Sequence, residues 1–379
     1  MTATAATPTD TRLPIPPDPR PLALPPLAER PLVSVLIASY NYADYVGQAI
    51  QSVLGQSYDH LEVVVCDDAS RDDSCAVVEQ YAAGDARVRL VRHERNAGMA
   101  AATNTAFAAS RGQIVSLLDA DDIYRPGKLA AIVREFQRHP EVGFILHRGM
   151  CVDAQGREIQ EIPFLTGFEC GWIADRLVRR GGRWRDMPTS ALSFRREPAE
   201  YVFPIPEPEF RRASDGFIFT LLPLLTEVSA VDEVLHEYRV HGRNDFGAAQ
   251  WTVDSVRADL GFIAGQVAEV NRRLAVLGVR GRSLDLARNL LYRQQSLVLD
   301  LLTGRPRRAL LGDYVALVPR MVRDDLYGRL QKALGLVVYG LAIPLPVGAR
   351  SRWLNAALGY NQVKQHVRRV LDRGRAVVR

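Results

Sequence analysis

Four short apolar runs alternate with helical patterns in the first third of the chain, and this alternation constrains the fold more than any other feature. The runs cover residues 33–38, 61–66, 88–91 and 114–118, and an alanine-rich helical pattern covers 99–110. Each run is continuously apolar, as in strands that are buried on both faces. Strands that alternate with helices at this spacing predict an α/β fold, with a mostly parallel sheet and helices on both faces.

The fourth run ends abruptly in three carboxylates, Asp119, Asp121 and Asp122. Because carboxylates are costly inside a buried strand, we expect them at its carboxyl end, where open α/β sheets bind their ligands. Clustered carboxylates repel one another unless a cation joins them, and hard oxygen ligands suit Mg²⁺ or Mn²⁺. The alternative is an acidic turn that caps the helix expected near Pro126.

Polar residues also follow the other three runs, and two of these groups have two readings. No GxGxxG follows the first run, which argues against a dinucleotide-binding dehydrogenase. Tyr40 would stack on a nucleotide base or lie as an aromatic at a sheet edge. Asp67 would accept an N–H from a base or cap a helix. Gly98 precedes a helix N-terminus, which is a natural neighbour of a diphosphate. The groups are Ser39-Tyr40-Asn41, Asp67-Asp68-Ala69-Ser70 and Asn96-Ala97-Gly98.

Taken together with Asn104 and Asp119-Ala120-Asp121-Asp122, these groups resemble the motifs of the family 2 glycosyltransferases, which have the GT-A fold. The resemblance is close over 31–148 and looser up to about 247. It implies that the turn with Ser39, Tyr40 and Asn41 lines a base pocket and that Asp67 hydrogen-bonds the base. Asn96 and Gly98 would lie beside the diphosphate.

The same resemblance implies the metal and catalytic residues. Asp119 would face the ribose or the metal, and Asp121 would bind the Mn²⁺ or Mg²⁺ that bridges the diphosphate. Asp215 is the candidate general base, although Ser214 replaces the usual Glu before it. His241, in Tyr238-Arg239-Val240-His241, would touch the metal or diphosphate, or would be a surface loop histidine.

Two departures from the family pattern affect the expected chemistry. Thr103 precedes Asn104 where an Arg is common, so diphosphate contacts would differ. The QxxRW motif of processive members is missing: Arg183-Trp184 resembles its end but lies before Asp215, and Arg180 replaces the Gln. We therefore expect a non-processive, inverting enzyme that adds one sugar by direct displacement, without the covalent intermediate of retaining glycosidases.

Two other functions compete with this interpretation. A nucleotidyltransferase would favour a Gly-rich loop with Arg or Lys after the first strand, and residues 38–41 are not such a loop. A non-catalytic nucleotide-sugar-binding module would not need Asp119, Asp121 and Asp215. The resemblance implies a nucleotide-sugar donor, with a UDP-sugar favoured, and a glycan or lipid-linked acceptor in bacterial surface polysaccharide or glycolipid synthesis. No nucleic acid partner is expected.

We divide the 379 residues into three parts. Residues 1–31 hold nine of the 22 prolines and are expected to be a disordered leader. Residues 32–248 are expected to form the catalytic domain, and 249–379 a helical region with amphipathic patterns at 253–277 and 284–302. The four cysteines show no CxxC pairing, which favours a reducing compartment and a cytoplasmic protein.

The end of the chain is basic. Residues 320–379 contain twelve Lys or Arg against three Asp, and the uncharged stretch 333–349 carries Pro344 and Pro346. The prolines argue against a membrane span and favour a buried or interfacial hairpin. Such a tail suits an anionic partner, and one interpretation is peripheral contact with the inner face of the cell membrane. The alternative is a helical subdomain that packs on the catalytic domain, with its basic residues solvated.

Overall fold

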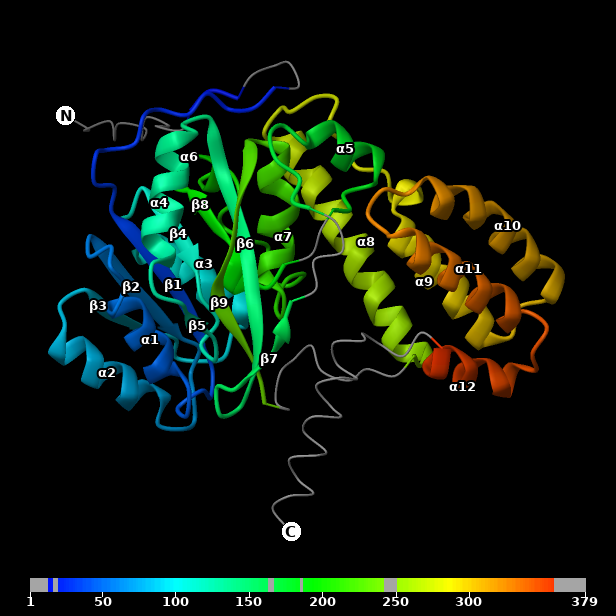
Figure 1. Ribbon diagram of the computed structural model, residues 1–379, viewed down its shortest axis with the longest axis horizontal. Helices are drawn as coiled ribbons and strands as arrows, with labels where there is room; N and C mark the ends of the chain where they lie inside the picture. Colours follow the sequence, from blue (N-terminus) through cyan, green and yellow to red (C-terminus); the bar gives the residue numbers. More distant parts are fainter. Residues whose placement is uncertain (1–12, 16–19, 163–166, 185–186, 242–250, 358–379) are drawn as a thin grey trace, which may run out of the picture.

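The structure is a computed structural model, and it describes every residue outside 1–12, 16–19, 163–166, 185–186, 242–250 and 358–379. Within the described residues, a nine-stranded sheet with helices forms the larger part, and further helices pack beside it (Figure 1). The strands are β1 (Val33–Ser39), β2 (Leu61–Asp67), β3 (Val88–Arg92), β4 (Ile114–Leu117), β5 (Ile123–Tyr124), β6 (Val142–Asp153), β7 (Glu158–Glu161), β8 (Ser193–Arg195) and β9 (Glu227–Val240).

The strand order is β3-β2-β1-β4-β8-β6-β9-β5, with β7 paired to β6. β1 is parallel to β2 and β4, and β2 is parallel to β3. Beyond β4 the sheet becomes mixed, because β8 is antiparallel to both β4 and β6. Ser39 pairs with Asp67, and Leu36 with Leu117, so the carboxyl ends of β1, β2 and β4 lie at one edge.

Alternate residues of the buried strands feed two cores. Val35 and Ile37 of β1 face one core, whereas Leu36 faces the other. On the first face lie α1 (Val46–Leu54), α2 (Ser74–Gly84) and α4 (Lys128–Arg138). On the second lie α3 (Met99–Ala109), α5 (Ala174–Arg179), α6 (Arg196–Ala199) and α7 (Ser214–Leu221), with the short 3₁₀ turns η1 (Thr189–Ala191) and η2 (Leu222–Leu224). The continuous apolar character of the strands follows from this burial on both faces.

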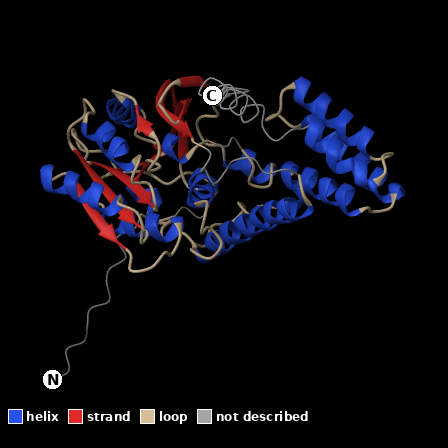
Figure 2. Cartoon of the chain, turned by 90° about the horizontal axis from the view of Figure 1, so that it is seen from below, coloured by secondary structure: helices blue, strands red, loops and turns tan. Residues whose placement is uncertain are grey.

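The helical region contains α8 (Val253–Val276), the short turn η3 (Leu286–Arg288), α9 (Leu290–Thr303), α10 (Arg307–Arg323), α11 (Arg329–Ala342) and α12 (Val347–Ala357). It lies to one side of the sheet, and Figure 2 shows it built from helices. Leu297, Leu301, Leu317 and Val338 are among the side chains of its own core. α11 and α12 are joined through Pro344 and Pro346, at the hairpin predicted over 333–349.

α8 links the two parts of the molecule. Its Val267 and Leu274 belong to a core of the sheet, whereas its Val256 belongs to the core of the helical region. Gln266 Nε2 donates hydrogen bonds to Gly216 O, at 2.6 Å, and to Thr220 Oγ1, at 2.7 Å. α8 therefore supports α7 directly.

Most predicted elements are confirmed. The four predicted strands are β1 to β4, and α3 and α8 match their patterns within a residue or two. α9 begins later than the predicted 284, because Asn289 Oδ1 accepts from Tyr292 N and caps the helix there.

Part of the segment expected to be disordered packs on the sheet region. Leu22 is buried, and its N–H donates to Leu225 O at 2.8 Å. Further on, Arg195 Nη2 donates to Pro25 O at 2.5 Å. In the described part of the chain, no helix is both long and apolar enough to cross a membrane. The basic residues beyond 357 lie outside the described residues.

Candidate active site

The turns after β1 and β2 are fastened to each other at the carboxyl edge. Asn41 has φ of 60°, a left-handed conformation that Asn tolerates better than most residues. Its N–H donates to Ser70 Oγ at 2.9 Å, and its Oδ1 accepts from Arg71 N at 2.8 Å. Ser39 lies buried beneath this turn, and its carbonyl accepts from Asp68 N. The fastened turn leaves Tyr40 37% exposed, open to a stacking partner.

Asp67 is wholly buried at the end of β2, and only one of its two carboxylate oxygens accepts a hydrogen bond from the described residues. Its Oδ1 accepts from Ser70 N at 2.8 Å. Its Oδ2 accepts no N–H or O–H bond from the described residues, although the weak donor Cys75 lies beside it. Burial, followed by the nearby Asp67 carboxylate, raises the pKa of the Cys75 thiol to about 11. A buried carboxylate oxygen without a strong donor suits a ligand N–H.

Asp68 shapes the loop after β3. Its Oδ1 accepts from Ala97 N at 2.8 Å and its Oδ2 accepts from Gly98 N at 2.7 Å. Asn96 Nδ2 adds a bond to the Asp68 carbonyl, and His93 Nδ1 lies 2.7 Å from Oδ1. The two adjacent carboxylates therefore differ. Asp68 binds the backbone N–H groups of Ala97 and Gly98, whereas Asp67 has one oxygen available to a ligand.

Gly98 is required for a reason that the sequence did not reveal. Its φ is +99°, and a Cβ there would lie 2.5 Å from Arg211 Cγ. Arg211 O accepts from Met99 N at 2.8 Å, and Arg211 Nη2 donates to Asn96 Oδ1 at 2.7 Å. The segment before α7 thus covers the start of α3. Arg211 also brings a guanidinium to this loop, whereas Thr103 stands where family members commonly carry an Arg.

Thr103 and Asn104 make internal contacts. Thr103 Oγ1 donates to Met99 O at 2.8 Å and lies 3.2 Å from Ser214 Oγ. Asn104 hydrogen-bonds both backbone groups of Ile205. Asn104 Nδ2 donates to Ile205 O at 2.9 Å, and Asn104 Oδ1 accepts from Ile205 N at 2.7 Å. Asn104 therefore fixes the loop before α7.

Three carboxylates from two elements meet at this edge. Burial raises the pKa of the Asp119 carboxyl well above its usual range, and the charges of Asp121 and Asp215 raise it further. Asp215 lies in the first turn of α7, where its Oδ1 accepts from Gly216 N at 3.0 Å. Thr189 Oγ1 donates to Asp215 Oδ2 at 3.3 Å, and the same hydroxyl is close enough to Asp119 to lower the pKa of that carboxyl in part. The structure therefore brings Asp215 to Asp119 and Asp121, from which it lies far away in the sequence.

His241 belongs to the same cluster. Its Nε2 lies 2.9 Å from Asp121 Oδ2, and its side chain is only 1% exposed. The ring stacks on Tyr45, with centroids 4.8 Å apart, and meets the edge of Tyr42 at 6.1 Å. The alternative of a surface loop histidine is therefore wrong.

Asp122 has a different environment from its neighbours. It is buried, and its Oδ2 accepts from Ser190 Oγ at 2.6 Å while its Oδ1 accepts from Arg239 N at 2.9 Å. Burial, and then the charges of Asp121 and Asp119, raise the pKa of Asp122 well above its usual range. Arg239 Nε also donates to Asp121 O, at 2.9 Å. Asp122 thus ties the acidic turn to β9, and Ser190 and Arg239 are site residues that sequence reasoning missed.

The residues that resemble part of QxxRW have structural partners. Arg183 Nη1 pairs with Asp324 Oδ2 at 2.9 Å. Trp184 is buried, and its Nε1 donates to Phe219 O at 3.0 Å.

The acidic residues fit a hard cation only in combination with a ligand. Among the described residues, no three His, Cys, Asp or Glu side chains form a group that would hold a metal ion unaided. Burial, and then the charges of Asp121 and Asp215, raise the pKa of Asp119, so a cation beside these carboxylates would lower the cost of ionising them. A divalent cation that also binds a diphosphate would take oxygens from Asp121 and Asp119 and complete its coordination from the ligand.

Comparison with known proteins identifies the family. The sequence model of glycosyl transferase family 2 matches residues 34–203. An uncharacterized glycosyltransferase of Nostoc sp. (strain PCC 7120) is 35% identical over 263 residues, which are 69% of this chain and 81% of that protein. The chain belongs to glycosyl transferase family 2.

Other known proteins match a smaller part of this chain or are similar to it in fold alone. The succinoglycan biosynthesis protein ExoU of Rhizobium meliloti (strain 1021) is 36% identical over 157 residues, so the chain spans 45% of ExoU with 39% of its own length. The crystal structure of S. aureus TarS 1–349 in complex with UDP-GlcNAc has a TM-score of 0.51 at 15% identity, over 87% of this chain and 93% of that one. This likeness confirms the expected GT-A fold.

Proposed function

We propose that this glycosyltransferase moves one sugar from a nucleotide-diphosphate sugar to an acceptor hydroxyl with inversion, in the synthesis of a bacterial surface polysaccharide or glycolipid. The observation that carries the proposal is the meeting of Asp119, Asp121 and Asp215 at the carboxyl edge of the sheet. ExoU, a relative named for succinoglycan biosynthesis, supports a polysaccharide acceptor. A non-catalytic module would have no need of these carboxylates, and the family match sets a nucleotidyltransferase aside.

The donor occupies the edge of the sheet from β2 to β4. Tyr40 stacks on the base above the turn of Ser39 and Asn41, and Asp67 Oδ2 accepts a base N–H. A UDP-sugar is the favoured donor, and the imide N–H of uracil, which thymine shares, would fit this acceptor. The diphosphate lies by Asn96 and Gly98, where the exposed Arg211 adds a positive charge.

Asp121, with Asp119 and His241 beside it, would hold the divalent cation, Mn²⁺ or Mg²⁺. Bound there, the cation would neutralise the leaving diphosphate, which is the main electrostatic demand of the reaction.

Asp215 acts as the general base. Its carboxylate is oriented by Gly216 N and Thr189 Oγ1 at the start of α7. It takes the proton of the acceptor hydroxyl as that oxygen attacks the anomeric carbon and the bond to the diphosphate breaks. A single displacement inverts the anomeric configuration. We expect release after one sugar, because the chain lacks the QxxRW motif of processive members.

A lipid-linked acceptor would place the enzyme on the inner face of the membrane as a cytoplasmic, peripheral protein. The outer face of α11 supports this, since its apolar residues recur at helical spacing and are 46% to 82% exposed. They are Leu330, Leu334, Val337 and Leu341. Contact with anionic lipid would then use this face together with neighbouring basic residues such as Arg329.

A screen of UDP-, GDP- and dTDP-sugars by thermal shift with Mn²⁺ tests the proposal. The correct donor raises the apparent stability by mass action, by about 2.7 kcal/mol at a concentration of 100 Kd. NMR of the transferred sugar then shows whether the anomeric configuration is inverted. Retention, or no stabilisation by any nucleotide-sugar, would contradict it.

A further inference from the structure

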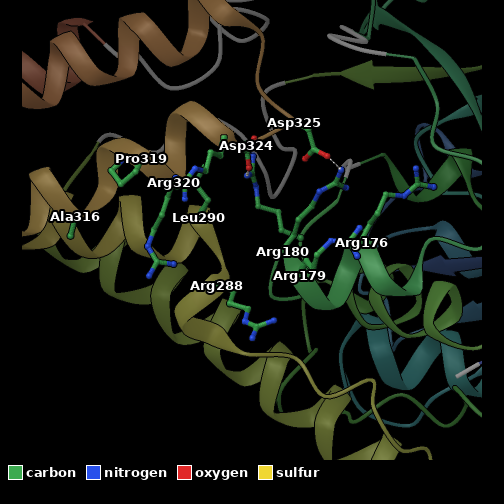
Figure 3. Close-up of a pocket in the computed structure, with 12 residues that line it drawn as sticks. Arg176, Arg179, Arg180, Arg288, Leu290, Ala316, Pro319, Arg320, Asp324 and Asp325 are labelled. Atoms are coloured by element: carbon green, nitrogen blue, oxygen red, sulfur yellow. Dashed lines mark hydrogen bonds and ion pairs between the residues drawn. The ribbon is translucent and has the colours of Figure 1, made fainter. Parts of the chain in front are cut away.

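A pocket of about 570 Å³ lies where the helical region meets the catalytic region, and it is lined chiefly by arginine. Seven of its twelve lining residues are arginines, and the acidic ones are Asp324 and Asp325. Figure 3 shows side chains that reach it from α5 on one side and from α10 on the other. We call it the arginine pocket. None of its lining residues belongs to the candidate active site.

Two of the arginines join the regions. Arg180 pairs with Glu169 at 2.8 Å and also bonds Asp325, which follows α10. Arg183 pairs with Asp324 at 2.9 Å, and its guanidinium lies 4.4 Å from the centre of the Tyr327 ring. These contacts engage both acidic residues of the lining, so a structural role accounts for two arginines of the seven.

The remaining arginines leave the pocket with surplus positive charge. Within the described residues, the side chains of Arg179 in α5 and Arg323 in α10 have no hydrogen-bond or ion-pair partner. Arg320 donates to the carbonyl of Ala287, which leaves its charge uncompensated. The last two have weak pairs, Arg176 with Glu169 at 3.4 Å and Arg288 with Asp285 at 3.4 Å.

Such an arrangement is unfavourable when empty and favourable around an anion. Guanidinium groups that face one cavity repel one another, and a concave site focuses their potential on an anion that enters it. The planar N–H fork of Arg matches phosphate oxygens in a bidentate way. A singly charged carboxylate would neutralise little of the surplus, whereas a diphosphate carries several charges.

We infer that the arginine pocket binds a phosphate-bearing anion of about the size and charge of a diphosphate, in a site separate from the donor site. Because its arginines come from both regions, the anion would also bridge α5 to α10. Two sources offer this chemistry: a phosphorylated soluble molecule or polymer, and the headgroup of a phospholipid or lipid diphosphate.

The test uses full-length protein and inorganic pyrophosphate, titrated by calorimetry without divalent metal so that the donor site contributes little. The double variant Arg179→Gln/Arg323→Gln removes the two arginines without described partners and leaves the Arg180 and Arg183 pairs in place. The control, Arg138→Gln/Arg308→Gln, removes two charges from exposed positions outside the pocket. We expect the pocket variant to bind pyrophosphate roughly tenfold or more weakly, and the control to change less than about twofold.

A second measurement distinguishes the sources. If free pyrophosphate does not bind, sedimentation with phosphatidic acid vesicles replaces it, and a loss confined to the pocket variant supports a lipid headgroup. Equal behaviour of both variants in calorimetry and sedimentation, or no binding of either probe, overturns the inference. Neither measurement involves a nucleotide-sugar or turnover, so its outcome is independent of the proposed transferase reaction. Circular dichroism of both variants confirms that they are folded.

Discussion

The catalytic region and the helical region differ in where each places its unusual residues. The catalytic region buries acidic side chains, including Asp67, Asp68 and Asp122, whereas no buried acidic residue lies among the described residues of the helical region. The exposed large hydrophobic side chains show the reverse distribution. In the described chain Tyr40 alone lies before residue 249, and the other ten lie from α8 onward. One region is therefore built to hold charge inside, and the other to present an apolar surface outside.

Asp121→Asn should have the largest effect. A neutral amide of similar volume removes the charge proposed to bind the cation, so transfer should fall roughly 10⁴-fold or more while the fold survives. Turnover with and without EDTA, together with circular dichroism, measures this. Asp232→Asn, at a side chain that is 78% exposed, is the matched control. Near-normal turnover with EDTA also harmless would remove the metal role from Asp121.

Asp215→Asn separates binding from chemistry within the catalytic region. The variant should bind donor normally and lose about 10²–10⁴-fold in transfer, because only the proton acceptor is removed. Donor affinity by calorimetry and the transfer rate should be measured on the same sample. A variant that transfers normally, or that only stops binding donor, would point to another base.

Asp122→Ala tests whether adjacent buried carboxylates differ in purpose. It leaves Ser190 Oγ–H and Arg239 N–H without their buried acceptor, so the free energy of unfolding should fall by about 2–4 kcal/mol. Urea denaturation measures the loss. A cycle with Ser190→Ala should show strongly non-additive effects, and simple additivity would show that the two side chains do not depend on each other.

Leu334→Gln sharpens the comparison from the helical side. The residue lies on the exposed face of α11, so stability should hardly change, while partition onto anionic vesicles should weaken roughly fivefold. Val276→Gln, at a residue that is 73% exposed near the end of α8, is the control. If both variants sediment like the unchanged protein, the α11 face does not contact membranes.

The strands and the turns that follow them could be predicted, because an apolar run that ends in polar residues is a local signal. The sequence could not predict that Asp122 has a structural role while Asp119 and Asp121 lie beside Asp215. That role depends on Ser190 and Arg239, which lie 68 and 117 positions from Asp122 in the chain. The contact of Arg211 with Asn96 likewise spans 115 positions. The resemblance to a family indicated which residues to examine, whereas only the folded chain shows which of them already have partners.

The span of α8 across two cores has a consequence for how the molecule melts. A cut near residue 248 looks natural in the sequence, yet it would strip Val267 and Leu274 from the sheet's core and Gln266 from the helix that carries Asp215. We therefore expect heat to unfold the two regions in a single transition. The catalytic region therefore needs α8, the first helix of the helical region, to complete its hydrophobic core.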